Sequence, residues 1–166
     1  MNIVLEGPDG SGKSTLAGQI AQVLGRLVQP SEGPPKYPGE LNERIRRYAF
    51  FDGIIFDRHP VISQTIYATI RANNEERVDP QLEADFYNEH NIFIYCRATR
   101  LGKHVTKEHD TPEHLEKIER NYEAIIGHYD AWALSHANLI YRIGDNPLHV
   151  IHYLLHATGA AVIHEG

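Results

Sequence analysis

A glycine-rich segment near the start of the sequence has the residue types and spacing that bind the phosphates of a nucleotide. It reads Gly-Pro-Asp-Gly-Ser-Gly-Lys-Ser from Gly7 to Ser14, between a short apolar run and a helical pattern, which is the context of a phosphate-binding loop. Glycines allow a tight turn in which backbone N–H groups approach phosphate oxygens. The residues that we assign to ATP binding are Gly7, Pro8, Asp9, Gly10, Ser11, Gly12, Lys13, Ser14 and Thr15.

Two side chains at the end of this loop carry the expected chemistry. Lys13 is placed to reach the outer phosphates as a point charge, and the Ser14 hydroxyl is placed to complete a Mg2+ shell at the positive end of the following helix. We expect Lys13 to be exposed in the loop rather than packed. The alternative is a glycine-rich turn that binds nothing, and the flanking strand and helix disfavour it.

A second group of candidate catalytic residues, Asp57-Arg58-His59, directly follows the apolar strand pattern Gly53–Phe56. The carboxyl end of that strand is expected to lie beside the phosphate loop. There, Asp57 would hold Mg2+ through water or accept the proton of an attacking hydroxyl, and Arg58 would neutralise anionic oxygens. The alternative is that Asp57 only caps the following helix.

Glu6, the last residue of the first strand pattern, has two interpretations. Its carboxylate could assist the hydroxyl of the molecule that accepts the phosphoryl group. Alternatively, it could bond amides of the loop or hold Lys13 in place without touching the ligand. The sequence leaves both open.

The polar stretch from residue 97 to 111 is the candidate lid. Arg97 and Arg100 lie at its start, and closure would bring their guanidinium groups to the transferring phosphates. The alternative is a solvated loop of mixed charge.

The elements that must position these residues follow from alternating apolar runs and helical patterns. This order predicts a three-layer α/β fold, an open parallel sheet with helices on both faces and the ligand at the carboxyl edge. Strands are expected near Asn2–Glu6, Leu27–Gln29, Gly53–Asp57, Ile92–Cys96 and Leu139–Ile143. Helices are expected near Lys13–Leu24, Glu40–Tyr48, Val61–Ala72, Pro80–Glu89, Thr111–Leu134 and Leu148–His156.

Composition narrows the class of protein further. The 166 residues suit one domain, 1–166, and the net charge of -6 gives no general basic field for nucleic acid. The single cysteine, Cys96, allows no internal disulfide, which favours a reducing compartment. The sequence shows no signal segment and no apolar run of membrane-spanning length, so we expect a cytoplasmic protein without a membrane partner. If a phage encodes the chain, the expected compartment is the cytoplasm of its host.

The phosphate loop with its leading Leu5-Glu6, followed by Asp57-Arg58-His59 and then Ser63 and Tyr67, resembles the thymidylate kinase family and its deoxynucleoside kinase relatives. The resemblance covers nearly the whole chain. It implies a five-stranded P-loop kinase fold with ATP and Mg2+ at the first loop, an arginine-bearing lid, adenine near residues 144–147, and a possible homodimer. The acceptor-binding residues that we assign are Glu32, Tyr37, Arg58, Ser63 and Tyr67.

The acceptor region, residues 30–52, departs from the family pattern. Family members carry Arg-Glu-Pro-Gly-Gly after the second strand, whereas this chain has Ser-Glu-Gly-Pro-Pro from Ser31 to Pro35, and the helical insertion that usually follows is compressed. Without that arginine, a free monophosphate lacks a fixed cationic partner. Arg44, Arg46 and Arg47 are the candidates to replace it.

A shortened acceptor region also suits a larger substrate. Phage enzymes that resemble thymidylate kinases phosphorylate the hydroxymethyl group of 5-hydroxymethyluracil within DNA, and such a base must leave the stack and rest on aromatic faces. The candidates for that role are Tyr37, Tyr48, Phe50, Phe51 and Tyr67. Phe50, Phe51 and Phe56 are expected to fill the core instead, because aromatic residues before and within a buried strand usually do so.

The sequence therefore predicts an ATP-dependent kinase whose acceptor is a pyrimidine deoxynucleotide or deoxynucleoside. Two alternatives stay open. One is a kinase of 5-hydroxymethyluracil in DNA, which differs only in the acceptor. The other is a nucleotide-sensing regulatory protein that binds ATP without transfer, which turnover would exclude.

Overall fold

The computed structural model describes residues 1–70, 76–98 and 112–160 of the chain, apart from the side chains of residues 112–115 and 117–119. Its centre is a sheet of parallel strands in the order β2-β3-β1-β4-β5. The strands are β1 (Ile3–Glu6), β2 (Val28–Gln29), β3 (Ile55–Asp57), β4 (Ile92–Arg97) and β5 (Leu139–Arg142). The helices are α1 (Lys13–Leu24), α2 (Glu40–Tyr48), α3 (Pro60–Ala68), α4 (Pro80–Asn88), α5 (Pro112–His136) and α6 (Leu148–Thr158).

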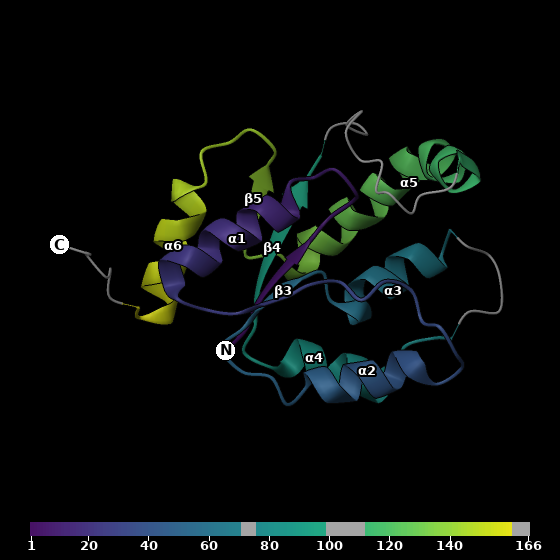
Figure 1. Cartoon of the computed structure of the whole chain (residues 1–166), viewed down its shortest axis with the longest axis horizontal. Helices are drawn as coiled ribbons and strands as arrows, with labels where there is room; N and C mark the ends of the chain where they lie inside the picture. Colours follow the sequence, from purple (N-terminus) through teal and green to yellow (C-terminus); the bar gives the residue numbers. More distant parts are fainter. Residues whose placement is uncertain (71–75, 99–111, 161–166) are drawn as a thin grey trace.

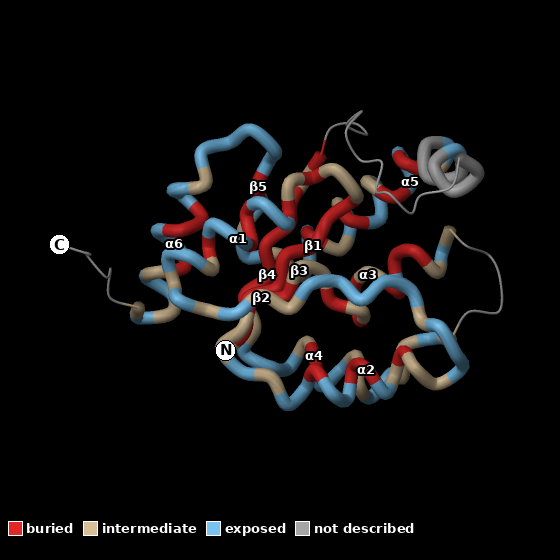
Figure 2. The backbone as a smooth tube through the Cα atoms, viewed as in Figure 1, coloured by how far each residue is buried: buried red, intermediate tan, exposed pale blue. Residues whose placement is uncertain are grey.

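Helices cover both faces of the sheet and produce three layers (Figure 1). Because successive strand residues point to opposite faces, β1 contributes to two separate cores. Val4 packs in the core under α2, α3, α4 and α5, whereas Ile3 and Leu5 pack in the core under α1 and α6. The buried segments converge on the central strands in Figure 2, as expected for a parallel sheet covered on both faces. The predicted α/β class and five-stranded parallel sheet are confirmed.

Every element expected from the sequence has a counterpart, with shifted ends. The strand expected to end at Cys96 continues through Arg97, so the first residue of the candidate lid belongs to β4. Residues 99–111, including Arg100 and the expected cap Thr111, lie outside the described residues. None of the described helices is both long enough and apolar enough to cross a membrane.

The prediction that Phe50 fills the core is wrong. Phe56 is buried and Phe51 packs against the core, but the side chain of Phe50 is 89% exposed. The reason is its position after α2: the helix ends at Tyr48, whose ring fills the core, and the next residues turn toward β3.

Candidate functional site

The phosphate loop lies between β1 and α1, at the carboxyl edge of the sheet. Gly7, Gly10 and Gly12 have positive φ angles of 153°, 75° and 78°, so the loop uses backbone conformations that side chains disfavour. Gly7 is also packed against the neighbouring strand, because a Cβ atom there would lie 2.0 Å from the carbonyl oxygen of Cys96. The loop therefore requires glycine for two reasons: the positive φ angles at all three positions and the close approach of a neighbouring strand at Gly7.

Lys13 is buried, contrary to the prediction that it is exposed. Its side chain is 7% exposed, and its ammonium group donates hydrogen bonds to the Pro8 carbonyl oxygen at 2.7 Å and to the Ser11 hydroxyl at 3.1 Å. Burial, together with the positive charge of Arg58, lowers the pKa of Lys13 to about 8. The loop folds around its own lysine, which explains why Lys13 is not free in solvent.

Arg58 comes to the same loop from β3. β1 and β3 are paired with Leu5 opposite Asp57, so the residue after the strand reaches the phosphate loop. The Arg58 guanidinium donates to the carbonyl oxygen of Gly7 at 2.9 Å and contacts the Asp9 carboxylate at 3.2 Å. Its charged carbon lies 5.3 Å from the centre of the Tyr67 ring, a cation–π arrangement. The sequence-based expectation that the two motifs meet is therefore met by their geometry.

Asp57 and Ser14 are the residues assigned to Mg2+. Ser14 is exposed in the first turn of α1, and Asp57 is half-buried at the end of β3. Among the described residues, no hydrogen bond engages the Asp57 carboxylate. A hydroxyl in the first turn and a carboxylate at the adjacent strand end are oxygen donors of the kind that Mg2+ prefers, so these residues fit the ion.

The helix-cap alternative for Asp57 is wrong, because His59 caps α3. The ring nitrogen Nδ1 of His59 accepts a hydrogen bond from the Val61 amide at 3.3 Å. The ring also stacks on Phe86, with centres 4.2 Å apart, and burial lowers the pKa of His59 to about 3. His59 is therefore neutral and caps α3, and the Asp57 carboxylate does not.

Glu6 is fully buried behind the loop. One of its oxygens accepts the His59 amide at 2.6 Å, and the other accepts the Tyr129 hydroxyl at 3.0 Å and the Gly7 amide at 3.4 Å. Burial raises the pKa of Glu6 to about 7, opposed by the nearby charge of Arg58. Of the two interpretations of Glu6, the geometry fits the one in which it bonds loop amides.

Two tyrosines of α5 were missed by the sequence reasoning. Tyr129 donates to Glu6, and the Tyr122 hydroxyl donates to the Asp9 carbonyl oxygen at 3.4 Å. They are seven residues apart and so lie on one face of the helix. That spacing is a signal visible in the sequence, but it does not say which part of the molecule the face meets.

Arg97 is placed differently from a free lid residue. At the end of β4, its guanidinium forms two hydrogen bonds with the Asp130 carboxylate of α5, at 2.8 and 2.9 Å. The same carboxylate accepts the Tyr95 hydroxyl at 2.7 Å. Arg97 therefore joins β4 to α5 in this structure.

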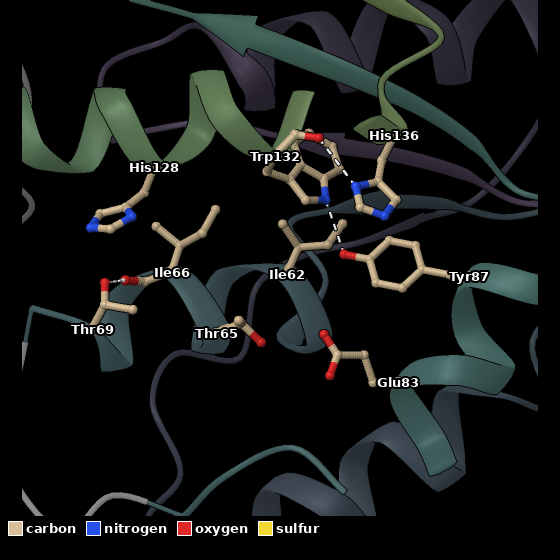
Figure 3. Close-up of a pocket in the computed structure, with 9 residues that line it drawn as sticks. All are labelled: Ile62, Thr65, Ile66, Thr69, Glu83, Tyr87, His128, Trp132 and His136. Atoms are coloured by element: carbon tan, nitrogen blue, oxygen red, sulfur yellow. Dashed lines mark hydrogen bonds between the residues drawn. The ribbon is translucent and has the colours of Figure 1, made fainter. Parts of the chain in front are cut away.

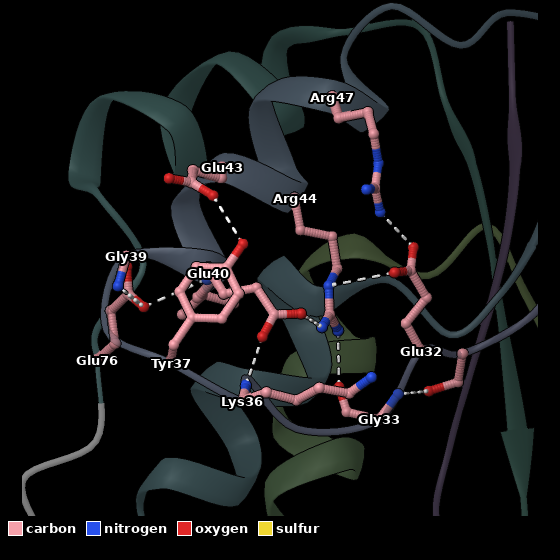
Figure 4. A network of polar contacts seen from close by, with 12 residues as sticks. Glu32, Gly33, Lys36, Tyr37, Gly39, Glu40, Glu43, Arg44, Arg47 and Glu76 are labelled. Carbon is pink, nitrogen blue, oxygen red and sulfur yellow. Dashed lines mark hydrogen bonds and ion pairs between the residues drawn. The ribbon is translucent and has the colours of Figure 1, made fainter.

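The acceptor region contains an ion cluster on α2, which we define as Glu32, Glu40, Arg44 and Arg47 (Figure 4). Arg44 is only 4% exposed, is paired with Glu40 and donates to the Gly33 carbonyl oxygen at 2.7 Å. Arg47 and the Tyr48 hydroxyl both bond the Glu32 carboxylate. Two of the three arginines proposed to replace the family arginine thus already have carboxylate partners.

The other residues assigned to the acceptor lie in two places. The Tyr67 ring is buried beside Arg58, while the Ser63 hydroxyl donates within α3 to the His59 carbonyl oxygen at 3.1 Å. Tyr37 is exposed in the segment before α2, and its hydroxyl donates to Glu43 at 3.0 Å. Tyr67 adjoins the phosphate loop, whereas Glu32 and Tyr37 belong to the α2 region.

A cavity of about 410 Å3 lies elsewhere, between α3, α4 and α5 (Figure 3). No residue of the phosphate loop and no residue of Asp57-Arg58-His59 lines it. Its wall consists of Ile62, Thr65, Ile66, Thr69, Glu83, Tyr87, His128, Trp132 and His136. The cavity does not coincide with the site built from the two motifs.

The sheet order and the glycine loop between β1 and α1 give the chain a P-loop fold similar to that of thymidylate and deoxynucleoside kinases. The solved structure of the YorR protein from Bacillus subtilis, in complex with phosphorylated GDP, is 17% identical, with 96% of both chains covered and a TM-score of 0.69. Deoxyadenosine kinase from M. mycoides with bound dATP is 19% identical, covering 96% of this chain and 100% of that one, with a TM-score of 0.57.

Thymidylate kinase from Ehrlichia chaffeensis gives a similar result: 16% identity, 95% and 97% of the two chains covered, and a TM-score of 0.55. At such low identity these likenesses show the fold. No family model matches the sequence, and the search of curated proteins found no match.

Proposed function

We propose that this protein is an ATP-dependent kinase that transfers the γ-phosphoryl group to a pyrimidine acceptor, either a hydroxyl of a deoxynucleoside or a phosphate oxygen of a deoxynucleotide. The observation that carries the proposal is the meeting of two cations at one loop, the buried Lys13 and the partly buried Arg58. Lys13 donates to the carbonyl of Pro8 and Arg58 to the carbonyl of Gly7, the preceding residue. Phosphoryl transfer depends mainly on positioning and on charge stabilisation, which two such cations supply.

The described residues divide the work between the phosphates and the acceptor. Lys13 and the loop amides would hold the outer phosphates, and Arg58 would neutralise charge on the oxygens of the transferred group. Asp57 would orient the acceptor hydroxyl and take its proton as the hydroxyl oxygen bonds to the γ-phosphorus and the bond from that phosphorus to the bridging oxygen breaks, which releases ADP. Mg2+, held by Ser14 and Asp57, would supply charge neutralisation at the phosphates when bound.

The α2 ion cluster bears on the choice of acceptor. A monophosphate dianion needs cations, but Arg44 and Arg47 are engaged by Glu32 and Glu40. We therefore place an uncharged deoxynucleoside ahead of a deoxynucleotide as the acceptor. Because Arg44 and Arg47 are paired, they are also not free to bind the phosphates of DNA, so transfer to 5-hydroxymethyluracil in DNA is kept as an outcome of the assay rather than proposed.

The neighbours' names agree with this proposal. One is a deoxyadenosine kinase bound to dATP and another is a thymidylate kinase, so the fold carries phosphoryl transfer to both kinds of acceptor. The YorR structure holds a phosphorylated guanine nucleotide.

The test is a product assay with ATP and Mg2+ that offers deoxynucleosides, deoxynucleoside monophosphates and hydroxymethyluracil-containing DNA side by side. Mass spectrometry identifies which acceptor gains a phosphate. Arg58→Ala should lower kcat by about 100-fold, because it removes one charge-stabilising group, while Arg26→Ala should leave kcat unchanged, because Arg26 bonds the Met1 carbonyl away from the loop. ATP binding with no product from any acceptor would contradict the kinase and favour a nucleotide-sensing protein.

A further inference from the structure

The backbone of Arg58 has an unusual conformation for its residue type. Among the residues that the structure describes, Arg58 is the one non-glycine residue with positive φ, at 78°. A side chain costs about 1–3 kcal/mol in this region, so neighbouring contacts must hold it there. Backbone strain of this kind clusters at functional sites, where it can set the direction of a side chain.

Two hydrogen bonds, each donated by a backbone amide, hold the strained segment. The Arg58 amide donates to the Leu5 carbonyl oxygen at 3.0 Å, which continues the pairing of β3 with β1. The next amide, that of His59, donates to the Glu6 carboxylate at 2.6 Å. With both amides of the segment fixed to β1, the side chain of Arg58 points back over the loop and meets Gly7 and Asp9.

We propose that Glu6 is a positioning residue: its buried carboxylate holds the Arg58–His59 peptide in the left-handed conformation that directs the Arg58 guanidinium to the phosphate loop. Tyr129 of α5 keeps the carboxylate in place through its hydroxyl. The proposal rests on the proposed function for the role of Arg58 in transfer, but the clamp itself is a feature of the fold.

The surroundings of Glu6 argue against a direct chemical role. The side chain has no exposed surface, and each carboxylate oxygen already accepts a hydrogen bond. A general base must come within hydrogen-bond reach of the proton it takes, and a buried, doubly engaged carboxylate does not. A positioning role uses these same hydrogen bonds.

The first experiment compares Glu6→Ala with Glu6→Gln. The glutamine carbonyl can still accept the His59 amide, so Glu6→Gln should keep kcat within about fivefold, whereas Glu6→Ala should lose about 10–100-fold in kcat with a smaller change in the KM of ATP. A proton-accepting role predicts the opposite, with glutamine as inactive as alanine. That result would overturn the proposal.

A double-mutant cycle tests whether Glu6 acts through Arg58. In the Arg58→Ala background, Glu6→Ala should cost less than about threefold more, because the side chain it positions is already gone. Additive losses would contradict the proposal. If Glu6→Ala does not fold, Tyr129→Phe takes its place in the cycle. Its matched control is Tyr87→Phe, which removes a hydroxyl bonded to Trp132 of the same helix, outside the site.

A measurement without turnover separates this proposal from the kinase assignment. Amide hydrogen exchange at His59 should be slow in the wild type and in Glu6→Gln, and at least about tenfold faster in Glu6→Ala. The Ile55 amide, bonded to Leu27 within the sheet, serves as the internal control. Protection of His59 in a protein that transfers no phosphate would support the clamp and contradict the proposed function. If Glu6→Ala transfers phosphate and its His59 amide exchanges as slowly as in the wild type, the kinase assignment is supported and the clamp is contradicted.

Discussion

The phosphate loop and the α2 ion cluster both gather charged side chains, but they balance them differently. In the α2 cluster, two arginines face two glutamates. The pKa of Glu32 is lowered, because hydrogen bonds from Tyr48 and Arg47 outweigh the effect of partial burial. In the phosphate loop, burial lowers the pKa of Lys13 to about 8 and raises that of Glu6 to about 7. The surroundings of Glu32 therefore favour its charged form, whereas those of Lys13 and Glu6 disfavour theirs.

This difference indicates where a ligand is needed. Charges that are neutralised by partners within the protein gain little from an added anion. Within the described part of the chain, the buried Lys13 bonds only a carbonyl and a hydroxyl, and the partly buried Arg58 shares one carboxylate, that of Asp9. Both cations would therefore gain from phosphate oxygens. We therefore expect the ligand at the phosphate loop rather than at the α2 ion cluster, although both contain arginine and glutamate.

The largest expected effect is that of Lys13→Ala on transfer. Loss of the ammonium group from the loop should reduce kcat by about 10²–10³-fold or more, since removal of one preorganised charge-stabilising group has this size. Folding should be retained, because the substitution removes a buried cation whose charge is disfavoured by burial. Kinetics and thermal unfolding of the same sample check both halves. An unfolded Lys13→Ala protein would show that the lysine is structural, like the α2 arginines.

Gly7→Ala should cause the next largest effect, on stability. The new Cβ would meet the Cys96 carbonyl oxygen in a backbone conformation that suits glycine, and each of these two conflicts costs about 1–3 kcal/mol. The control is Gly18→Ala in α1, where a Cβ meets nothing within 4 Å and should raise the free energy of unfolding by about 0.5–1 kcal/mol. Denaturant unfolding measures both. If Gly7→Ala changed the free energy of unfolding no more unfavourably than Gly18→Ala, the loop would accommodate the new Cβ without strain, and the prediction would be wrong.

Nucleotide binding should take up protons at alkaline pH. The pKa of Lys13 is lowered to about 8 in the free protein, and phosphate oxygens would raise it again, so above pH 8 ATP binds together with a proton. The affinity should then fall by up to about tenfold per pH unit above pH 8. Calorimetry at pH 8.5 in buffers of different ionisation enthalpy measures the uptake.

The same pKa shift predicts a change in folding stability, and the sign follows from proton counts. Between pH 8 and the usual lysine value, the unfolded chain binds more protons than the folded one. The contribution of Lys13 to the free energy of unfolding therefore rises with pH in that window. Lys13→Ala should remove this rise, and a wild-type stability that does not depend on Lys13 there would contradict the assigned shift.

The sequence predicted the fold and the meeting of the two motifs well, because both depend on local pattern. Apolar runs fixed the strands, and the rule that parallel strands end at one edge brought Arg58 to the loop. The His59 cap and the continuation of β4 to Arg97 depend on neighbours that the local pattern does not contain.

What the sequence did not reveal are contacts between distant segments. The burial of Lys13 follows from the loop closing on its own lysine, and the Glu6–Tyr129 hydrogen bond joins residues 123 positions apart. Likewise, the arginines of α2 read as a free basic group until Glu32 is placed against them. Periodicity gives the face of a helix but not the partner that covers it.

Arg47→Ala should have the smallest effect, and it tests the structural side of the comparison. Arg47 is 56% exposed, so its ion pair with Glu32 is screened by solvent and is worth at most about 1 kcal/mol of stability. If the acceptor is an uncharged deoxynucleoside, the KM for the acceptor should change less than about twofold. Steady-state kinetics with nucleoside and monophosphate acceptors decides the matter. A rise in KM confined to the monophosphate would mean that phosphate displaces Glu32 from Arg47, and that the α2 cluster is itself a ligand site held closed by its own carboxylate.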